Sequence, residues 1–166
     1  MRFLGIDPGT AVTGFGVIES PRSDCFQCID YGTIRSKASE PMVDRLKSIY
    51  DGVCHVIKTY APDLMALEDI FYGHNVQAAL KLGQVRGIVM LAGSNAGIAV
   101  VTFAAREVKQ SLTGYGAASK EQVQRMVKEI LGLKHIVNPL DASDALAMAL
   151  CHAQRWWTEQ KLKNNK

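Results

Sequence analysis

The sequence holds few cysteines and no long apolar run. Its longest apolar stretches fall well short of the ~20 residues that a membrane-spanning helix needs. Of its 166 residues only 4 are cysteines, and Cys25 and Cys28 form the one CxxC pair. A structural zinc site usually needs a second ligand pair at short spacing, so we interpret all four as reduced small residues. Asp7 comes too early for a signal-peptide core, and we expect a soluble, cytoplasmic protein.

The sequence also lacks the residue sets of nucleophilic catalysis. No Ser-His-Asp or Cys-His arrangement is evident, and the four histidines have no obvious mutual spacing. The net charge of +3 is too small to indicate nucleic-acid binding by itself. Its distribution is uneven, because residues 1–80 hold 7 basic and 10 acidic residues whereas residues 81–134 hold 8 basic and 3 acidic ones. An enzyme that cuts a polyanion or a solvated helix face would equally explain this asymmetry.

Length and composition predict one globular domain with a mixed α/β fold. Hydrophobic residues make up 48% and charged residues 21% of the chain, as in ordinary soluble proteins. Periodicity and turn residues predict five strands, at 2–7, 13–18, within 25–34, 63–68 and 99–103, the first two as a hairpin. They also predict five helices. The first begins at Pro41, the second spans 75–95 and the third spans 104–112. The fourth follows a Ser119 cap with Gln122 in the capping box, and the fifth spans about 141–157.

This order of elements predicts a mixed five-stranded sheet with helices on both faces. We assign residues 1–157 to one domain and residues 158–166 to a C-terminal tail, which we expect to be disordered.

Four acidic residues stand where a carboxylate is costly unless it is paired or binds a cation: Asp7, Glu68, Asp141 and Asp144. Asp7 and Glu68 each end a predicted strand, and the other two share a face at the start of an alanine-rich helix. Each has a local alternative, namely a turn hydrogen bond, an exposed strand end or a helix cap. Their coincidence favours a hard-metal site, because Mg²⁺ takes oxygen ligands shared with substrate phosphates. That is the chemistry of phosphodiester cleavage.

Five segments, in order, resemble the RuvC family of bacterial Holliday-junction resolvases. They are Gly5–Thr10 with Thr13–Val17, Leu67–Phe71, Ala79–Gly87, Ala105–Gln110 and Asp141–Ala147. The similarity extends from about residue 2 to residue 153. It implies a ribonuclease H-like fold and a homodimer that works with the RuvA–RuvB branch-migration complex. The implied activity is resolution of four-way DNA junctions by paired, metal-dependent nicks that leave 5′-phosphates, in homologous recombination and DNA repair.

The resemblance also assigns roles to residues of this chain. The four acids, Asp7, Glu68, Asp141 and Asp144, match the family's metal-binding catalytic positions. The carboxylates are expected to hold two Mg²⁺ ions per active site, with Mn²⁺ able to substitute.

DNA contacts are implied for a further set: Arg106, Lys109, Lys120 and Phe71. The two lysines match positions associated with DNA contact and catalysis. Phe71 matches an aromatic residue that can stack on an unpaired base, and its alternative is ordinary packing after a strand.

Small residues recur in the predicted helix 75–95: Ala78, Ala79, Gly83, Gly87, Ala92 and Gly93. Glycine costs stability inside a helix, so their number indicates close approach by another element. Together with the resemblance, this predicts that the helix forms the dimer contact.

Three other classes remain as alternatives. An actin-like ATP-dependent phosphotransferase begins with the same strand–turn–strand pattern, but it needs two such domains and leaves the Asp141 and Asp144 pair unexplained. A YqgF-type RNA nuclease shares the fold but is shorter, and the block from 75 to 120 favours RuvC. A non-catalytic DNA-binding module is disfavoured because all four acids are present.

Overall fold

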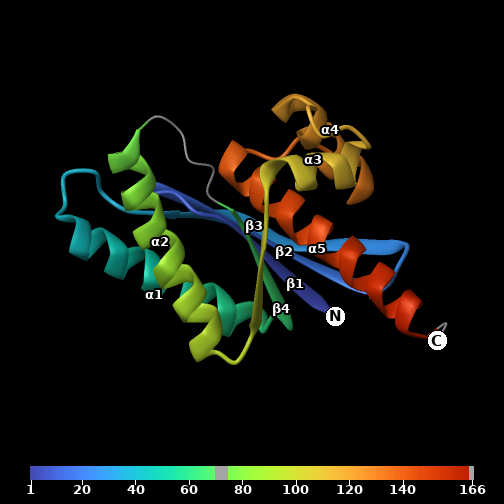
Figure 1. The fold of residues 1–166 in the computed structure, drawn as a ribbon, viewed down its shortest axis with the longest axis horizontal. Coiled ribbons are helices and arrows are strands. Elements are labelled where there is room, and N and C mark those ends of the chain that lie inside the picture. The colour runs from blue at the N-terminus through green and yellow to red at the C-terminus, as the bar shows by residue number, and fades with distance from the viewer. Residues whose placement is uncertain (70–74, 165–166) are drawn as a thin grey trace.

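The computed structural model describes residues 1–69 and 75–164 (Figure 1). The described residues form strands β1 (Arg2–Asp7), β2 (Val12–Arg22), β3 (Cys25–Arg35), β4 (Leu64–Glu68) and β5 (Ala99–Phe103). Their helices are α1 (Met42–Tyr60), α2 (Val76–Asn95), α3 (Ala105–Thr113), α4 (Lys120–Ile130) and α5 (Leu140–Asn164). None of these helices is both long and apolar enough to cross a membrane.

The strands form one mixed sheet in the order β3-β2-β1-β4-β5. β1, β2 and β3 are antiparallel neighbours, whereas β4 pairs in parallel with both β1 and β5. The predicted hairpin and the predicted five-stranded mixed sheet are therefore confirmed. The parallel pairing of β1 with β4 brings the carboxyl ends of these two strands to the same edge of the sheet.

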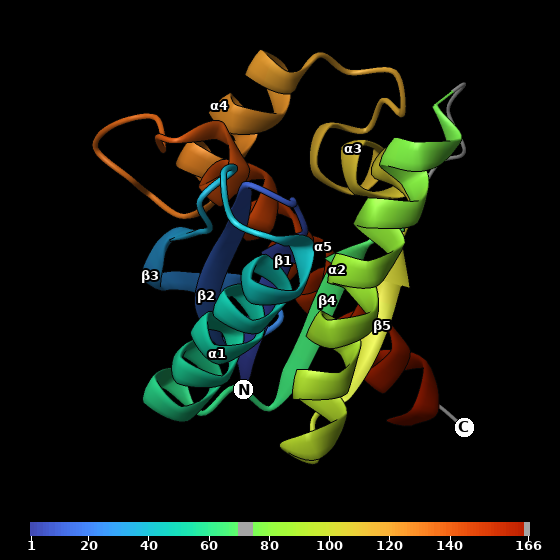
Figure 2. The same ribbon diagram turned by 90° about the vertical axis from the view of Figure 1, so that its left-hand side faces the viewer.

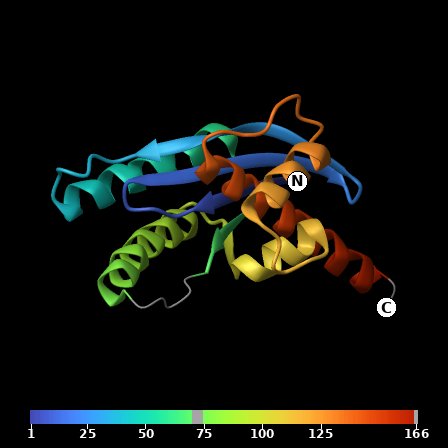
Figure 3. The ribbon, with the colours of Figure 1, turned by 90° about the horizontal axis from the view of Figure 1, so that it is seen from above.

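Helices cover both faces of the sheet, as the sequence predicted (Figure 2). Figure 2 shows α1 and α2 in front of the strands and α5 behind them, and Figure 3 shows α3 and α4 beside α5. Alternation of side chains along β1 separates the two cores, because Phe3 packs toward α5 while Leu4 and Ile6 pack toward α1 and α2.

Close packing of α5 against β1 and β2 depends on glycine. A Cβ atom on Gly5 would lie 1.9 Å from the backbone oxygen of Ala145, and one on Gly14 would lie 2.0 Å from the backbone oxygen of Asp141. The strands and the helix thus touch backbone to backbone, which only glycine permits. This contact determines where the first turns of α5 lie relative to the end of β1.

The last helix is longer than the sequence predicted. α5 continues to Asn164, so the expected end at residue 157 is wrong, and residues 158–164, which we assigned to a disordered tail, are helical. Two interactions lie at the start of the extension. The Trp157 indole donates a hydrogen bond of 2.8 Å to the hydroxyl of buried Ser20, and Arg155 forms a 3.0 Å ion pair with Glu159.

The glycine contact predicts a large cost for a single added methyl group. Gly5→Ala should lower the free energy of unfolding by about 3 kcal/mol or more. The new Cβ collides with backbone atoms of α5, which can move only if the whole helix shifts. Gly32→Ala is the matched control in β3. Its Cβ would meet only the Phe15 ring, at 2.9 Å, and a side chain can shift, so the cost should stay below ~1 kcal/mol. Equal costs in urea denaturation would contradict this account.

Candidate active site

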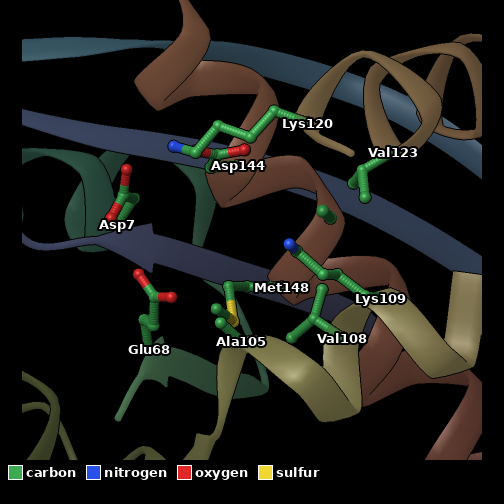
Figure 4. A pocket seen from close by; sticks show the side chains of 10 residues that line it. Asp7, Glu68, Ala105, Val108, Lys109, Lys120, Val123, Asp144 and Met148 are labelled. Carbon is green, nitrogen blue, oxygen red and sulfur yellow. The ribbon is translucent and has the colours of Figure 1, made fainter. Parts of the chain in front are cut away.

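Three of the predicted acids meet around one small cavity. Asp7 ends β1, Glu68 ends the neighbouring parallel strand β4, and Asp144 comes from the second turn of α5. All three line a cavity of about 100 Å³ (Figure 4). Figure 4 shows the Asp7 and Glu68 carboxylates projecting from the two strand ends into the same space. Residues separated by more than 130 positions in the sequence therefore form one acidic site.

Lys120 brings a positive charge into this site. Its ammonium nitrogen lies 2.8 Å from Oδ2 of Asp144, and the bond raises the pKa of Lys120. The lysine is the first residue of α4, whose start is set by the predicted capping box. The Ser119 amide donates to the Gln122 side chain at 2.8 Å, and the Gln122 amide donates to the Ser119 hydroxyl at 3.3 Å. A local cap thus determines where this cation lies.

The site holds more negative charge than its neighbours neutralise. Burial, and then the charges of Glu68, Asp144 and Asp141, raise the pKa of Asp7 from 3.8 to about 7, against the opposing effect of Lys120. Burial and the charge of Asp144 likewise raise the pKa of Glu68. Oxygen donors with raised pKa values are stabilised in their ionised form by an additional cation. The donor set is therefore suited to a hard divalent metal.

Asp141 lies at the edge of this arrangement. It precedes Asp144 by one turn and its charge acts on Asp7, but it does not line the cavity. Within residues 1–69 and 75–164, no three acidic, histidine or cysteine side chains are arranged as a preformed metal-binding cluster. Like-charged carboxylates repel one another, and Lys120 already holds one oxygen of Asp144. The structure thus brings together three of the four predicted ligands.

The predicted DNA contacts divide between two spaces. Lys109 lines the acidic cavity and also a larger adjacent cleft of about 930 Å³, which Arg106 lines as well. Glu68 belongs to both spaces, so the cleft opens directly beside the acids. Phe71 lies outside the described residues.

Sequence reasoning missed the role of Arg86. This residue of α2 reaches the residue just after β4, because its Nη1 atom lies 2.8 Å from Oδ1 of Asp69, which follows Glu68. The Arg86 side chain is 14% exposed, and its charge opposes the rise in the pKa of Glu68. Arg86 stood in one of the segments that indicated the family, but no local pattern pairs residues 17 positions apart.

The raised pKa of Asp7 predicts how stability changes with pH in the presence of a chelator. Ionising a carboxyl whose folded-state pKa exceeds its ordinary value opposes folding, so wild type should lose stability relative to Asp7→Asn as the pH rises from 3.8 toward 7. The variant should be more stable than wild type by roughly 2 kcal/mol or more at about pH 8.

Urea denaturation at several pH values measures this difference. Asp63→Asn serves as the control, because Asp63 is exposed and immediately precedes the opposite end of β4. If the difference in stability between wild type and Asp7→Asn did not change with pH, the pKa of Asp7 would not be raised in the folded chain.

The chain is similar to known proteins over most of its length. The sequence matches the family model for crossover junction endodeoxyribonuclease RuvC over residues 3–152. A protein of that name from Syntrophotalea carbinolica is 52% identical over 153 residues, which cover 92% of this chain and 94% of the relative. Another from Desulforamulus reducens is 48% identical over 154 residues, covering 93% and 94% of the two chains.

Solved structures show the same fold. T. thermophilus RuvC in complex with Holliday junction substrate is 34% identical and superposes with a TM-score of 0.91 over 96% of both chains. The yeast mitochondrial Holliday junction resolvase Ydc2 is 13% identical, with a TM-score of 0.67 over 98% of this chain and 81% of that one, which shows the fold alone. The expected ribonuclease H-like fold is thus confirmed. The chain belongs to the RuvC family of crossover junction endodeoxyribonucleases.

Proposed function

We propose that this chain resolves Holliday junctions as a structure-selective endodeoxyribonuclease in homologous recombination and DNA repair. The observation that carries the proposal is the convergence of Asp7, Glu68 and Asp144 on one cavity, in a member of this family. The relative from T. thermophilus, which shares this fold, was solved with a Holliday junction substrate. The match to RuvC over residues 3–152 leaves no observation that favours the actin-like or YqgF-type alternatives.

The proposed cofactor is a pair of divalent ions, Mg²⁺ with Mn²⁺ able to substitute, held by Asp7, Glu68, Asp141 and Asp144. The support is chemical, because all donors are carboxylate oxygens, and burial together with the charge of neighbouring carboxylates raises the pKa of Asp7 and of Glu68. Asp141 would join from the turn of α5 that precedes Asp144. When bound, such ions activate an attacking water and stabilise the leaving 3′-oxygen.

The residues around the acids position the DNA strand. Because Lys120 pairs with Asp144, its ammonium is held within the acidic cavity, where the scissile phosphate must lie if these acids act on it. Lys109 stands between the cavity and the larger cleft, and Arg106 lines that cleft. We assign all three to phosphate contacts, which supply much of the affinity for DNA. A stacking role for Phe71 stays a prediction from the family resemblance.

The proposed assembly is a homodimer formed through α2. Apolar side chains of this helix are exposed, namely Val76, Leu80, Met90 and Leu91. Its glycines differ in surroundings, because a Cβ on Gly93 would meet Val100 at 2.6 Å, whereas one on Gly87 would meet nothing within 4 Å. Packing within the protomer therefore explains why position 93 needs a glycine, but it does not explain the glycine at position 87. A two-fold dimer would present two active sites to two strands of like polarity, so that paired nicks follow.

Two parts of the function stay predictions. Cooperation with a RuvA–RuvB branch-migration complex is implied by the family resemblance, and a cytoplasmic location is expected from the sequence.

Cleavage of synthetic DNA tests the proposed activity. The purified protein should nick four-way junctions in the presence of Mg²⁺ or Mn²⁺, at paired positions that leave 5′-phosphates, and should spare linear duplex. Excess chelator should stop the reaction, because the water and the leaving oxygen then lack their activating ions. Equal cutting of linear and four-way DNA, or full activity in chelator, would refute the proposal.

The acid variants test the site within the same assay. Asp7→Asn, Glu68→Gln, Asp141→Asn and Asp144→Asn should each slow cutting by more than the ~10–100-fold that is lost when a residue hydrogen-bonded to a metal ligand is removed. Junction binding should persist, since it depends on phosphate contacts made elsewhere. Asp63→Asn, beside the opposite end of β4, should cut like wild type. An acid variant that cuts at a normal rate does not belong to the site.

Substitution on α2 tests the dimer. Gly87→Arg should yield monomers in sedimentation equilibrium and should uncouple the two nicks, because a long charged side chain would occupy the contact between helices. The protomer should still fold, since no atom lies within 4 Å of the added Cβ. Val43→Arg on α1, where the side chain is 75% exposed, is the matched control and should remain dimeric. A dimeric Gly87→Arg protein would assign the interface to another surface.

A further inference from the structure

The larger cleft beside the acids has the size and lining of a binding site. Its volume of about 930 Å³ falls within the range of ~300–1,000 Å³ typical of ligand sites. Glu68 and Asp69 line it at the end of β4, and Leu82 of α2 contributes to its lining. Arg106 and Lys109 line it from α3. A nucleic-acid strand that reaches Glu68 through this cleft would thus place its negatively charged phosphates beside two cations.

The loop between α3 and α4 places an aromatic side chain in this cleft. Tyr115 lines the cleft and is 63% exposed. Its ring has no aromatic partner among the described residues. A large exposed ring that packs on no neighbouring ring leaves a π-face available for a ligand.

Hydrogen bonds fix the backbone that carries this ring. The Tyr115 amide donates to the Thr113 hydroxyl at 3.1 Å, and that hydroxyl lies 2.8 Å from the carbonyl of Lys109. The Gln110 side chain donates to the carbonyl of Gly114 at 2.7 Å. These bonds tie the loop to α3, so the ring stands on a preorganised support rather than on a loose loop.

The residue after Tyr115 brings the loop close to a cation. A Cβ on Gly116 would lie 2.8 Å from Cγ and 3.1 Å from Nε of Arg106. The missing side chain at Gly116 therefore leaves the space that the Arg106 side chain occupies. The cleft combines an exposed ring with two cations, Arg106 and Lys109, which is the composition of grooves that bind single strands by stacking and phosphate contact.

We propose that Tyr115 stacks on the base of a nucleotide next to the scissile phosphate, while Arg106 and Lys109 hold the flanking phosphates. This inference rests on the proposed function. It identifies the residues of the cleft that would contact the DNA strand. The stacked base must be unpaired or displaced from its neighbour, since a base within a continuous duplex has no free face. Tyr115 would thereby favour distorted DNA over regular duplex.

Fluorescence of 2-aminopurine tests stacking directly. The probe base is placed in turn at each nucleotide flanking the cut in a synthetic four-way junction, and the protein is added with Ca²⁺ in place of Mg²⁺ to prevent cutting. Wild type and Tyr115→Phe should quench the probe at one position, because both keep the ring, whereas Tyr115→Ala should not. Tyr31→Ala, on the edge strand β3, is the control for loss of an exposed tyrosine and should quench like wild type.

Single-turnover cutting with Mg²⁺ gives the second readout. Tyr115→Ala should cut the junction about tenfold more slowly, within the range expected for loss of one stacked base, and Tyr115→Phe should cut at the wild-type rate. Matching thermal unfolding of the variants confirms that the loop change leaves the fold intact.

The outcomes separate the two proposals. Normal cutting and quenching by Tyr115→Ala would overturn the stacking role while leaving the nuclease in place. A Tyr115→Phe protein as defective as Tyr115→Ala would also overturn it, since the hydroxyl rather than the ring would then make the contact. If wild type never cuts junctions, but wild type and Tyr115→Phe quench the probe and Tyr115→Ala does not, the nuclease function is refuted and the stacking contact is supported.

Discussion

The active site depends on the backbone contact between α5 and the β1–β2 hairpin. Gly5 and Gly14 let the helix lie directly on the strands, with backbone atoms where side chains would otherwise be. Asp7 ends the same strand that carries Gly5, and Asp144 lies on the helix one residue before Ala145, which Gly5 contacts. The separation between these two carboxylates is therefore set by the packing of two elements. The parallel register of β1 with β4 adds Glu68 at the same edge.

This arrangement concentrates negative charge in a partly buried place, and that charge lowers the stability of the folded chain. Burial and neighbouring carboxylates raise the pKa of Asp7 to about 7, which means that the ionised site destabilises the folded chain. Lys120 reduces the cost through its pairing with Asp144, and Arg86 and Lys109 act on Glu68 in the same direction. A site built for cations is least stable without them, as is common where function opposes stability.

The helices around the site contribute separate parts of one surface. α3 and α4 carry the cations Arg106, Lys109 and Lys120, and the loop between them carries Tyr115. α2 lies on the opposite face of the sheet, but Arg86 connects it to Asp69 beside Glu68. An ion pair thus joins the proposed dimer helix to the residue that follows the proposed catalytic strand β4.

Local patterns in the sequence determined the elements and the candidate acids. Periodicity located all five strands and five helices of the described residues, and the capping signal at Ser119 was confirmed in detail. These features depend on neighbours within a few positions, so a single sequence carries them. The resemblance then supplied the family, which the family model and the relatives confirmed.

Only the tertiary structure decided which distant groups meet. The pairing of Lys120 with Asp144, the reach of Arg86 to Asp69 and the position of Asp141 outside the cavity follow from how helices pack on the sheet. The contact of α5 with β2 through Trp157 and Ser20, 137 positions earlier in the chain, also follows from this packing. No periodic pattern encodes such contacts, because they depend on distances between elements that local residue spacing leaves undetermined.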